Sequence, residues 1–188
     1  MTLPHPPLFD ILYKVFEKSG IRICRLNRGN LFIDKIQNGG KGMIRECTEK
    51  DMEMVRGYLQ DEPYGRAILT AVNKFGFKEH FQTVYVDVAN TENGEGKLNG
   101  VYLFLYRNII LLCKENHVDI DFLEQWMGIS APDKVAGRKD NVNIVSWLLT
   151  DYNMKTGVTD PGITDEDGVS VDCLAGAEYE GEWAVLTR

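Results

Sequence analysis

The chain has 188 residues, of which 44% are hydrophobic and 26% are charged, and its formal net charge is −7. This length and apolar content suit one folded domain with a sizeable core. The acidic balance argues against a nucleic-acid-binding protein, which usually carries a basic surface, and no apolar run reaches the roughly 20 residues that a membrane helix needs.

Ordered elements are predicted from Met43 onward. The first five residues, MIREC, form a short strand candidate that leads into a helix from Thr48 to about Gln60, because Thr48 and Asp51 are spaced as in a capping box. After a break at DEPYG, a second helix is predicted to end at Gly76. Both helices place apolar residues on one face: Met52, Val55 and Leu59 in the first, and Ile68, Leu69, Val72 and Phe75 in the second.

Three strands are predicted next. In 82–89, QTVYVDVA, valines alternate with Tyr85 and Asp87, which is the period of a strand. After a loop rich in Gly and Asn, the stretches 100–106 and 108–113 predict two strands joined by a tight turn. Both stretches are apolar on each face, which predicts a central position in the sheet.

Two helices enclose one more short strand. The stretch 119–128 predicts a helix that ends at Gly128, 133–137 is a strand candidate, and 138–149 predicts a last helix. The order β-α-α-β-β-β-α-β-α predicts an α/β fold with a mixed, largely antiparallel sheet flanked by helices. The last two helices have apolar stripes of their own: Ile120, Leu123 and Met127 in one, and Val142, Val145 and Leu149 in the other.

This order, together with several stretches of sequence, resembles the GNAT acetyltransferases. MIRECTEKDMEMVRGYL resembles their first strand and helix; EPYGRAIL…VNKFGF, GKLNGVYLFLYRNIILL and KVAGRKDNVNIV resemble the N-terminal half of a tandem GNAT group of Gram-positive bacteria. The resemblance covers residues 43–154. It implies transfer of an acetyl group from acetyl-CoA to an amine, carried out by a second half that binds acetyl-CoA beside a degenerate first half.

One feature of these enzymes is missing here. The family holds the CoA pyrophosphate on an R/Q-x-x-G-x-G/A loop after its fourth strand, where backbone N–H groups bind the anion. The matching segment, 114–121, has no glycine and carries Glu115, Asp119 and Asp121, whose charge repels phosphate. The resemblance therefore implies a supporting half that binds no acetyl-CoA, and no catalytic, cofactor or metal residue is assigned.

Two other functions remain open for such a half. It is either an interaction module that pairs with a catalytic GNAT half, or with itself through its sheet, or the product of a non-functional gene fragment. In each case no nucleic acid and no membrane is expected as a partner. The four cysteines are spread without a C-x-x-C pair and indicate reduced thiols, which favours a cytoplasmic protein.

Other residues are weighed against plain structural roles. Cys113 and His117 are better explained as a core thiol and a loop histidine than as a catalytic pair, and the three histidines lack the spacing of a metal site. The stretch TDEDGVSVDCL fails as a calcium loop, because Ile163 and Leu174 occupy its end positions. Three aromatic residues alternate along one predicted strand: Tyr102, Phe104 and Tyr106. They either belong to the core beneath a helix or line a substrate cleft or a contact with the partner half.

Both ends differ from the middle block in charge. Residues 1–42 carry 7 basic and 3 acidic residues, and residues 155–188 carry 2 basic and 8 acidic ones. The codons of Gly39, Gly40 and Lys41, just before Met43, can read as a ribosome-binding site, which predicts that residues 1–42 are an untranslated leader read as protein by a mistaken start assignment. A genuine N-terminal helix over 8–20 is the alternative. Residues 155–188 are predicted to be an acidic tail rich in Gly and Asp, from a truncated or frame-shifted gene. Both ends are expected to add few core contacts.

Overall fold

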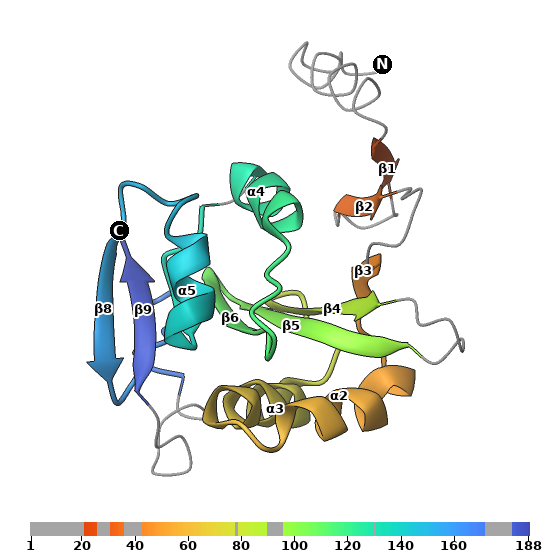
Figure 1. Cartoon of the computed structure of the whole chain (residues 1–188), viewed down its shortest axis with the longest axis horizontal. Helices are drawn as coiled ribbons and strands as arrows, with labels where there is room; N and C mark the ends of the chain where they lie inside the picture. Colours follow the sequence, from red (N-terminus) through yellow and green to blue (C-terminus); the bar gives the residue numbers. More distant parts are fainter. Residues whose placement is uncertain are drawn as a thin grey trace.

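The computed structural model describes residues 21–25, 31–35, 43–77, 79–89, 96–129, 131–171 and 182–188. Its central layer is a seven-stranded sheet in the order β3-β4-β5-β6-β7-β9-β8 (Figure 1). The strands of this sheet are β3 (Met43–Glu46), β4 (Gln82–Ala89), β5 (Lys97–Leu105), β6 (Asn108–Leu112), β7 (Lys134–Gly137), β8 (Asn153–Val158) and β9 (Trp183–Thr187). Two further strands, β1 (Ile21–Arg25) and β2 (Leu31–Lys35), pair with each other in a separate antiparallel sheet.

Helices cover both faces of the large sheet. On one face lie α2 (Met52–Leu59), preceded by the 3-10 turn η1 (Glu49–Asp51), and α3 (Pro63–Phe75). The other face carries α4 (Ile120–Ile129) and α5 (Lys139–Val145) (Figure 1). This α/β arrangement confirms the predicted fold class. The predicted order of elements also holds from β3 through α5.

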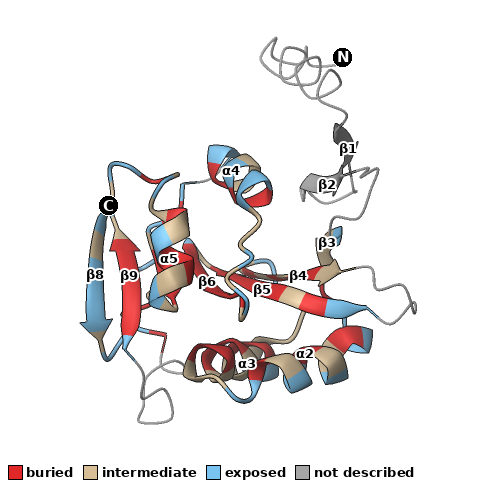
Figure 2. Ribbon diagram, in the orientation of Figure 1, coloured by how far each residue is buried: buried red, intermediate tan, exposed pale blue. Residues whose placement is uncertain are grey.

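Neighbouring strands of this sheet run antiparallel with one exception. Strands β6 and β7 are parallel, with Asn108 opposite Lys134 and Leu111 opposite Gly137, and α4 connects them. As predicted from their apolar residues, β5 and β6 lie in the interior of the sheet, and every residue of β6 is buried (Figure 2).

The sheet separates two apolar cores. Side chains of α2 and α3 pack on one face, where Val55, Leu59 and Ile68 are fully buried, as their spacing predicts. On the other face, Leu123 of α4 and Val142 and Val145 of α5 are fully buried against β5, β6 and β9. The two cores explain why strands such as β6 are apolar on both sides, because each face of the sheet is covered by helices.

The entry to α2 is held by a compact set of polar contacts. The Asp51 carboxylate accepts hydrogen bonds from the Thr48 backbone N–H at 2.9 Å and from the Thr48 hydroxyl at 2.8 Å. Arg45 of β3 donates two hydrogen bonds to the same carboxylate, at 2.8 and 2.6 Å, and holds the pKa of Asp51 well below its usual range. The predicted capping box of Thr48 and Asp51 therefore forms, but it caps the 3-10 turn η1. The α-helix begins only at Met52.

The C-terminal segment corrects one expectation. Residues 155–188 were expected to add few core contacts, and this is wrong. Strand β9 lies inside the sheet, between β7 and β8, and Trp183, Ala184 and Leu186 of this strand are fully buried. The ring of Trp183 packs edge-on against Tyr64 of α3, with 4.9 Å between ring centroids. The ordered domain therefore extends beyond residue 154.

Four smaller expectations are also corrected. Ile120 is 37% exposed rather than part of the buried stripe of α4, whose buried residues are Phe122, Leu123 and Met127. Helix α4 ends at Ile129, one residue after Gly128, and α5 ends at Val145, before the buried Leu149. Finally, Tyr106 does not share the face of Tyr102 and Phe104. Its backbone has a φ of 53°, and its ring stacks on Phe81 in the opposite core.

The predictions for the N-terminal block fall mostly outside the described residues. The alternative helix over 8–20 and the Gly39–Lys41 stretch lie there, as does the loop at 90–95. Strand β1 pairs with β2. The leader hypothesis stays a prediction.

Candidate functional site

The parallel pair β6–β7 indicates where to look for a site. The carboxyl ends of parallel strands meet at one edge of a sheet, and in α/β proteins ligands bind in the crevice outside these ends. Here β6 ends at Leu112 and continues into Cys113 and Lys114, while β7 ends at Gly137 and is followed by Arg138. Between these ends the main chain would offer free N–H and C=O groups to a ligand, unless other groups satisfy them.

All four main-chain polar groups of Cys113 and Lys114 are bonded to side chains of the protein. The Asn141 amide accepts a hydrogen bond from the Cys113 N–H at 2.9 Å and donates one to the Cys113 carbonyl at 3.0 Å. The Lys114 N–H donates to the Tyr58 hydroxyl at 2.8 Å, and the Lys114 carbonyl accepts from the Arg138 guanidinium at 2.8 Å. Side chains of α2, α5 and the β7–α5 junction thus close the opening between β6 and β7.

Arg138 and Asn141 are themselves held in place. Asp140 accepts two hydrogen bonds from Arg138, at 2.7 and 2.5 Å, and this pairing raises the pKa of the guanidinium. Glu62, which precedes α3, lies 4.0 Å from the same guanidinium. Asn141 is fully buried and also donates to the Asn116 side chain at 2.8 Å. The closure is therefore a bonded network that links both helical layers to β6.

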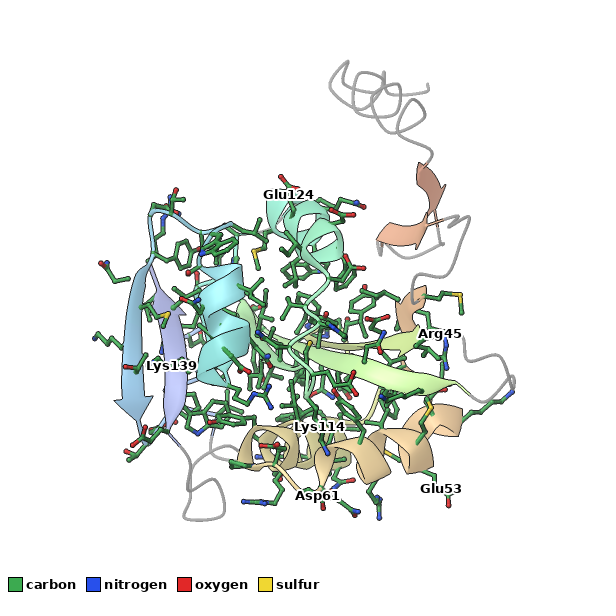
Figure 3. All side chains as sticks on the ribbon, viewed as in Figure 1. Arg45, Glu53, Asp61, Lys114, Glu124 and Lys139 are labelled. Atoms are coloured by element: carbon green, nitrogen blue, oxygen red, sulfur yellow. The ribbon has the colours of Figure 1, made fainter. Side chains whose placement is uncertain are left out.

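A hollow of about 310 Å³ lies beside this closure, on the α2 side of the sheet. Lys114 lines this hollow and lies near Asp61 (Figure 3), with 3.7 Å between the ammonium and the carboxylate. The Lys114 ammonium also lies 5.1 Å from the centre of the Tyr58 ring. Burial raises the pKa of Tyr58 to about 12, so its hydroxyl stays protonated and donates to the Asn99 carbonyl at 2.7 Å. The residues lining the hollow are Met54, Tyr58, Lys97, Leu98, Lys114 and Glu115.

The three carboxylates of the segment after β6 have different surroundings. Glu115 pairs with Lys97 at 2.5 Å on the border of the hollow, and this contact lowers its pKa. Asp119 accepts a hydrogen bond from the Phe122 N–H at 2.9 Å and so caps α4, while Asp121 is exposed in the first turn of that helix. In this segment Glu115 thus borders the hollow and Asp119 caps helix α4.

Cys113 and His117 have the structural roles that the sequence favoured. Cys113 is fully buried, its thiol donates to the Tyr102 hydroxyl at 3.5 Å, and burial raises its pKa to about 12. The nucleophilic form of cysteine is the thiolate, which is scarce at neutral pH with such a pKa. His117 is exposed, with its ring nitrogen 3.8 Å from Glu115. Tyr102 and Phe104 are core residues beneath α4, where Phe104 packs against Trp126.

Asp87 is a polar residue that sequence reasoning missed. Its side chain is 6% exposed, and its Oδ2 accepts a hydrogen bond of 3.3 Å from Asn99. Its Oδ1 is buried without a hydrogen-bond partner among the described residues. Burial raises the pKa of Asp87, and the nearby Asp119 adds to this effect. In the sequence, Asp87 occupied the polar phase of an alternating strand, which normally indicates exposure, and no local signal showed that α4 and its preceding segment cover this face.

Replacing Asp87 by asparagine is expected to stabilise the protein by about 1 kcal/mol at neutral pH, because a buried charge whose Oδ1 has no hydrogen-bond partner among the described residues is removed while the shape is kept. The native pKa lies above that of the unfolded chain. The free energy of unfolding of the wild-type protein therefore falls as pH rises from about 4 through the native pKa. Urea unfolding of both proteins at acidic and neutral pH measures this difference. An advantage of Asp87→Asn that is equal at both pH values would contradict the prediction.

Metal ions, membranes and known proteins add no further assignment. Within the described ranges, no three His, Cys, Asp or Glu side chains are grouped so that they could hold a metal ion. Among the helices of the described residues, none has the length and apolar character needed to cross a membrane. Comparisons of the chain with models of protein families, with curated proteins and with solved structures find no match.

Proposed function

We propose that this domain is the non-catalytic, supporting half of a GNAT-type acetyltransferase and that it does not bind acetyl-CoA itself. One observation carries the proposal: the protein's own side chains satisfy every main-chain polar group of Cys113 and Lys114, at the carboxyl end of β6. The resemblance of residues 43–154 to the first half of tandem GNAT proteins supplies the family.

The chemistry of acetyl-CoA makes this observation relevant. The molecule has an extended arm with two amide groups and a pyrophosphate, so binding at a strand end requires free main-chain partners and several anion donors. At the end of β6 the main-chain hydrogen-bonding groups are already occupied by side chains of the protein. Nearby cations are paired as well: Lys97 with Glu115, Lys114 with Asp61, and Arg138 with Asp140. The N-terminus of α4 is capped by the Asp119 carboxylate. Binding would have to break these contacts first.

Isothermal titration of the whole chain with acetyl-CoA tests the proposal. We expect no saturable heat, which corresponds to a Kd weaker than about 1 mM. A micromolar isotherm would refute the supporting role. In that case Lys114→Gln, which removes a charge beside the closure, shows whether binding occurs here, because a site elsewhere would leave the isotherm unchanged.

A supporting half implies a partner. We propose a catalytic GNAT half as that partner, with self-association through the sheet as the second candidate; neither nucleic acid nor membrane is proposed. The outer strand β8 disfavours a partner strand at its edge of the sheet. Strand β8 is mostly exposed, carries Lys155, and has a shift of register before Val158, all of which discourage the addition of another strand. Cys47 and Cys113 are free, buried thiols, which supports the proposed cytoplasmic location.

A further inference from the structure

The hollow beside the closure opens to solvent and has an apolar floor. The floor consists of Leu98 of β5, which is 5% exposed, and of Met54 and Tyr58 of α2, which are partly buried against the core. At the border, the side chains of Lys97 and Glu115 are 60% and 55% exposed, so a small molecule can enter from solvent. The volume of about 310 Å³ lies at the lower end for ligand pockets. It is roughly double the 150 Å³ of an engineered cavity that holds benzene, which leaves room for one ring and a short chain.

Most polar groups around the hollow are already bonded within the protein. The Tyr58 hydroxyl donates to the Asn99 carbonyl at 2.7 Å and accepts from the Lys114 N–H at 2.8 Å, so Tyr58 offers a ligand its ring rather than its hydroxyl. Lys97 and Glu115 pair at 2.5 Å, and their charges cancel. The polar group that remains for a ligand is the ammonium of Lys114.

This ammonium has bonding capacity that the protein does not use. It lies 3.7 Å from the Asp61 carboxylate, which is an ion pair too long for a hydrogen bond. None of its N–H groups has a hydrogen-bond acceptor among the described residues. The Asp61 side chain is 72% exposed, so the pair contributes little. The Lys114 side chain is only 29% exposed, so its attraction for an anion in the hollow is screened less than at an open surface.

One cation beside an apolar floor fits a monoanion with an aromatic body. A phosphate group requires several oriented donors, and Glu115 would repel its second charge, whereas a carboxylate requires one ammonium. A ring is favoured over an alkyl chain, because it stacks on the Tyr58 ring and makes favourable contacts with the Met54 sulfur. We propose that the hollow binds a small aromatic carboxylate, whose ring lies on the floor and whose carboxylate pairs with Lys114. The site does not depend on the proposed supporting function.

Titration of the full chain with hydrocinnamate, a benzene ring with a short carboxylate chain, tests the site by amide NMR at about 0.15 M salt. We expect saturable shifts of the amide signals of Tyr58, Leu98 and Lys114. The expected Kd is about 1 mM, which suits a ligand of roughly eleven non-hydrogen atoms. Propionate has the carboxylate without the ring, and hydrocinnamamide has the ring without the charge. Each should bind at least about fivefold more weakly.

Three substitutions of partly or fully exposed side chains, each expected to fold, test the charges. Lys114→Gln should weaken hydrocinnamate binding at least about fivefold. Glu115→Gln should strengthen it about threefold, because Lys97 is released and a nearby negative charge is removed. Lys139→Gln makes the same change as Lys114→Gln at an exposed position of α5 (Figure 3) and should leave the affinity unchanged.

Several results would overturn the proposal. Hydrocinnamate might fail to saturate or shift signals away from the hollow, the neutral amide could bind equally well, or Lys114→Gln could bind like wild type. The dipeptide acetyl-alanyl-phenylalanine presents the same ring and carboxylate as the C-terminus of a protein. Binding of this dipeptide at least about tenfold more tightly than hydrocinnamate would overturn the small-molecule site in favour of a partner's C-terminus.

Discussion

Replacing Trp183 by alanine is expected to lower the free energy of unfolding by about 3–5 kcal/mol. Trp183 is fully buried on β9, and its ring meets Tyr64 of α3 edge-on, at 4.9 Å and an interplanar angle of 82°. Its indole N–H has no hydrogen-bond partner among the described residues, so the loss arises from packing and from the cavity that alanine leaves. This is the largest effect we expect from a single substitution in the segment after residue 154.

Trp147 provides the matched control, because it is the same side chain at 73% exposure. Trp147→Ala should change the free energy of unfolding by less than about 0.5 kcal/mol. Urea unfolding followed by far-ultraviolet circular dichroism measures both variants without relying on tryptophan fluorescence. Equal losses for the two variants would mean that β9 does not belong to the core as the structure has it.

Replacing Asn141 by leucine is expected to cost about 2–4 kcal/mol. The substitution keeps the number and branching of the side-chain heavy atoms but leaves the Cys113 N–H without the acceptor that now lies at 2.9 Å, while the Cys113 C=O keeps the hydrogen bond from the Asn116 N–H at 2.9 Å. Asn141 is fully buried, so water cannot readily replace the amide. The unsatisfied N–H costs about 1–3 kcal/mol, and the larger leucine adds the cost of overpacking. Asn143→Leu, on the exposed side of α5, makes the same chemical change and should cost less than about 0.5 kcal/mol.

Urea unfolding again measures this pair, and hydrogen exchange adds a local test. The Cys113 amide should exchange much faster in Asn141→Leu than in wild type, because its acceptor is gone. Should Asn141→Leu prove as stable as Asn143→Leu, the closure at the end of β6 would not be a bonded network, and the main support for the proposed function would be lost.

Elements with a clear local pattern were predictable from the sequence. The alternation in 82–89 matches the bounds of β4, because period 2 is imposed by the strand itself. The apolar runs in β5 and β6 correctly indicated strands covered on both faces. The apolar spacing of α3 and its end at Gly76 also follow from residues within one segment, and the φ of 71° at that glycine shows why the helix stops there.

What the sequence could not supply depends on contacts between distant segments. Trp147 and Trp183 look alike in the sequence, and their burial differs because β9 inserts between β7 and β8. Asn141 is one polar residue in a short helix, and its role requires the end of β6, 28 residues earlier. Asp87 has the phase of an exposed residue until the segment before α4 covers it. The candidate site was therefore predictable as a segment, 114–121, but not as the network that closes it.

The position of β9 has a consequence for how the protein is made. On the ribosome, β7 and β8 emerge well before residues 183–187, yet β9 supplies the hydrogen-bonding partner of both. Until that strand leaves the exit tunnel, the inner edge of β7 and the facing edge of β8 have no partner in this sheet, and such edges readily pair with other chains. Emergence of β9 from the exit tunnel thus completes the sheet, and a nascent chain that still holds β9 in the tunnel is a natural client for chaperones that shield unpaired strands.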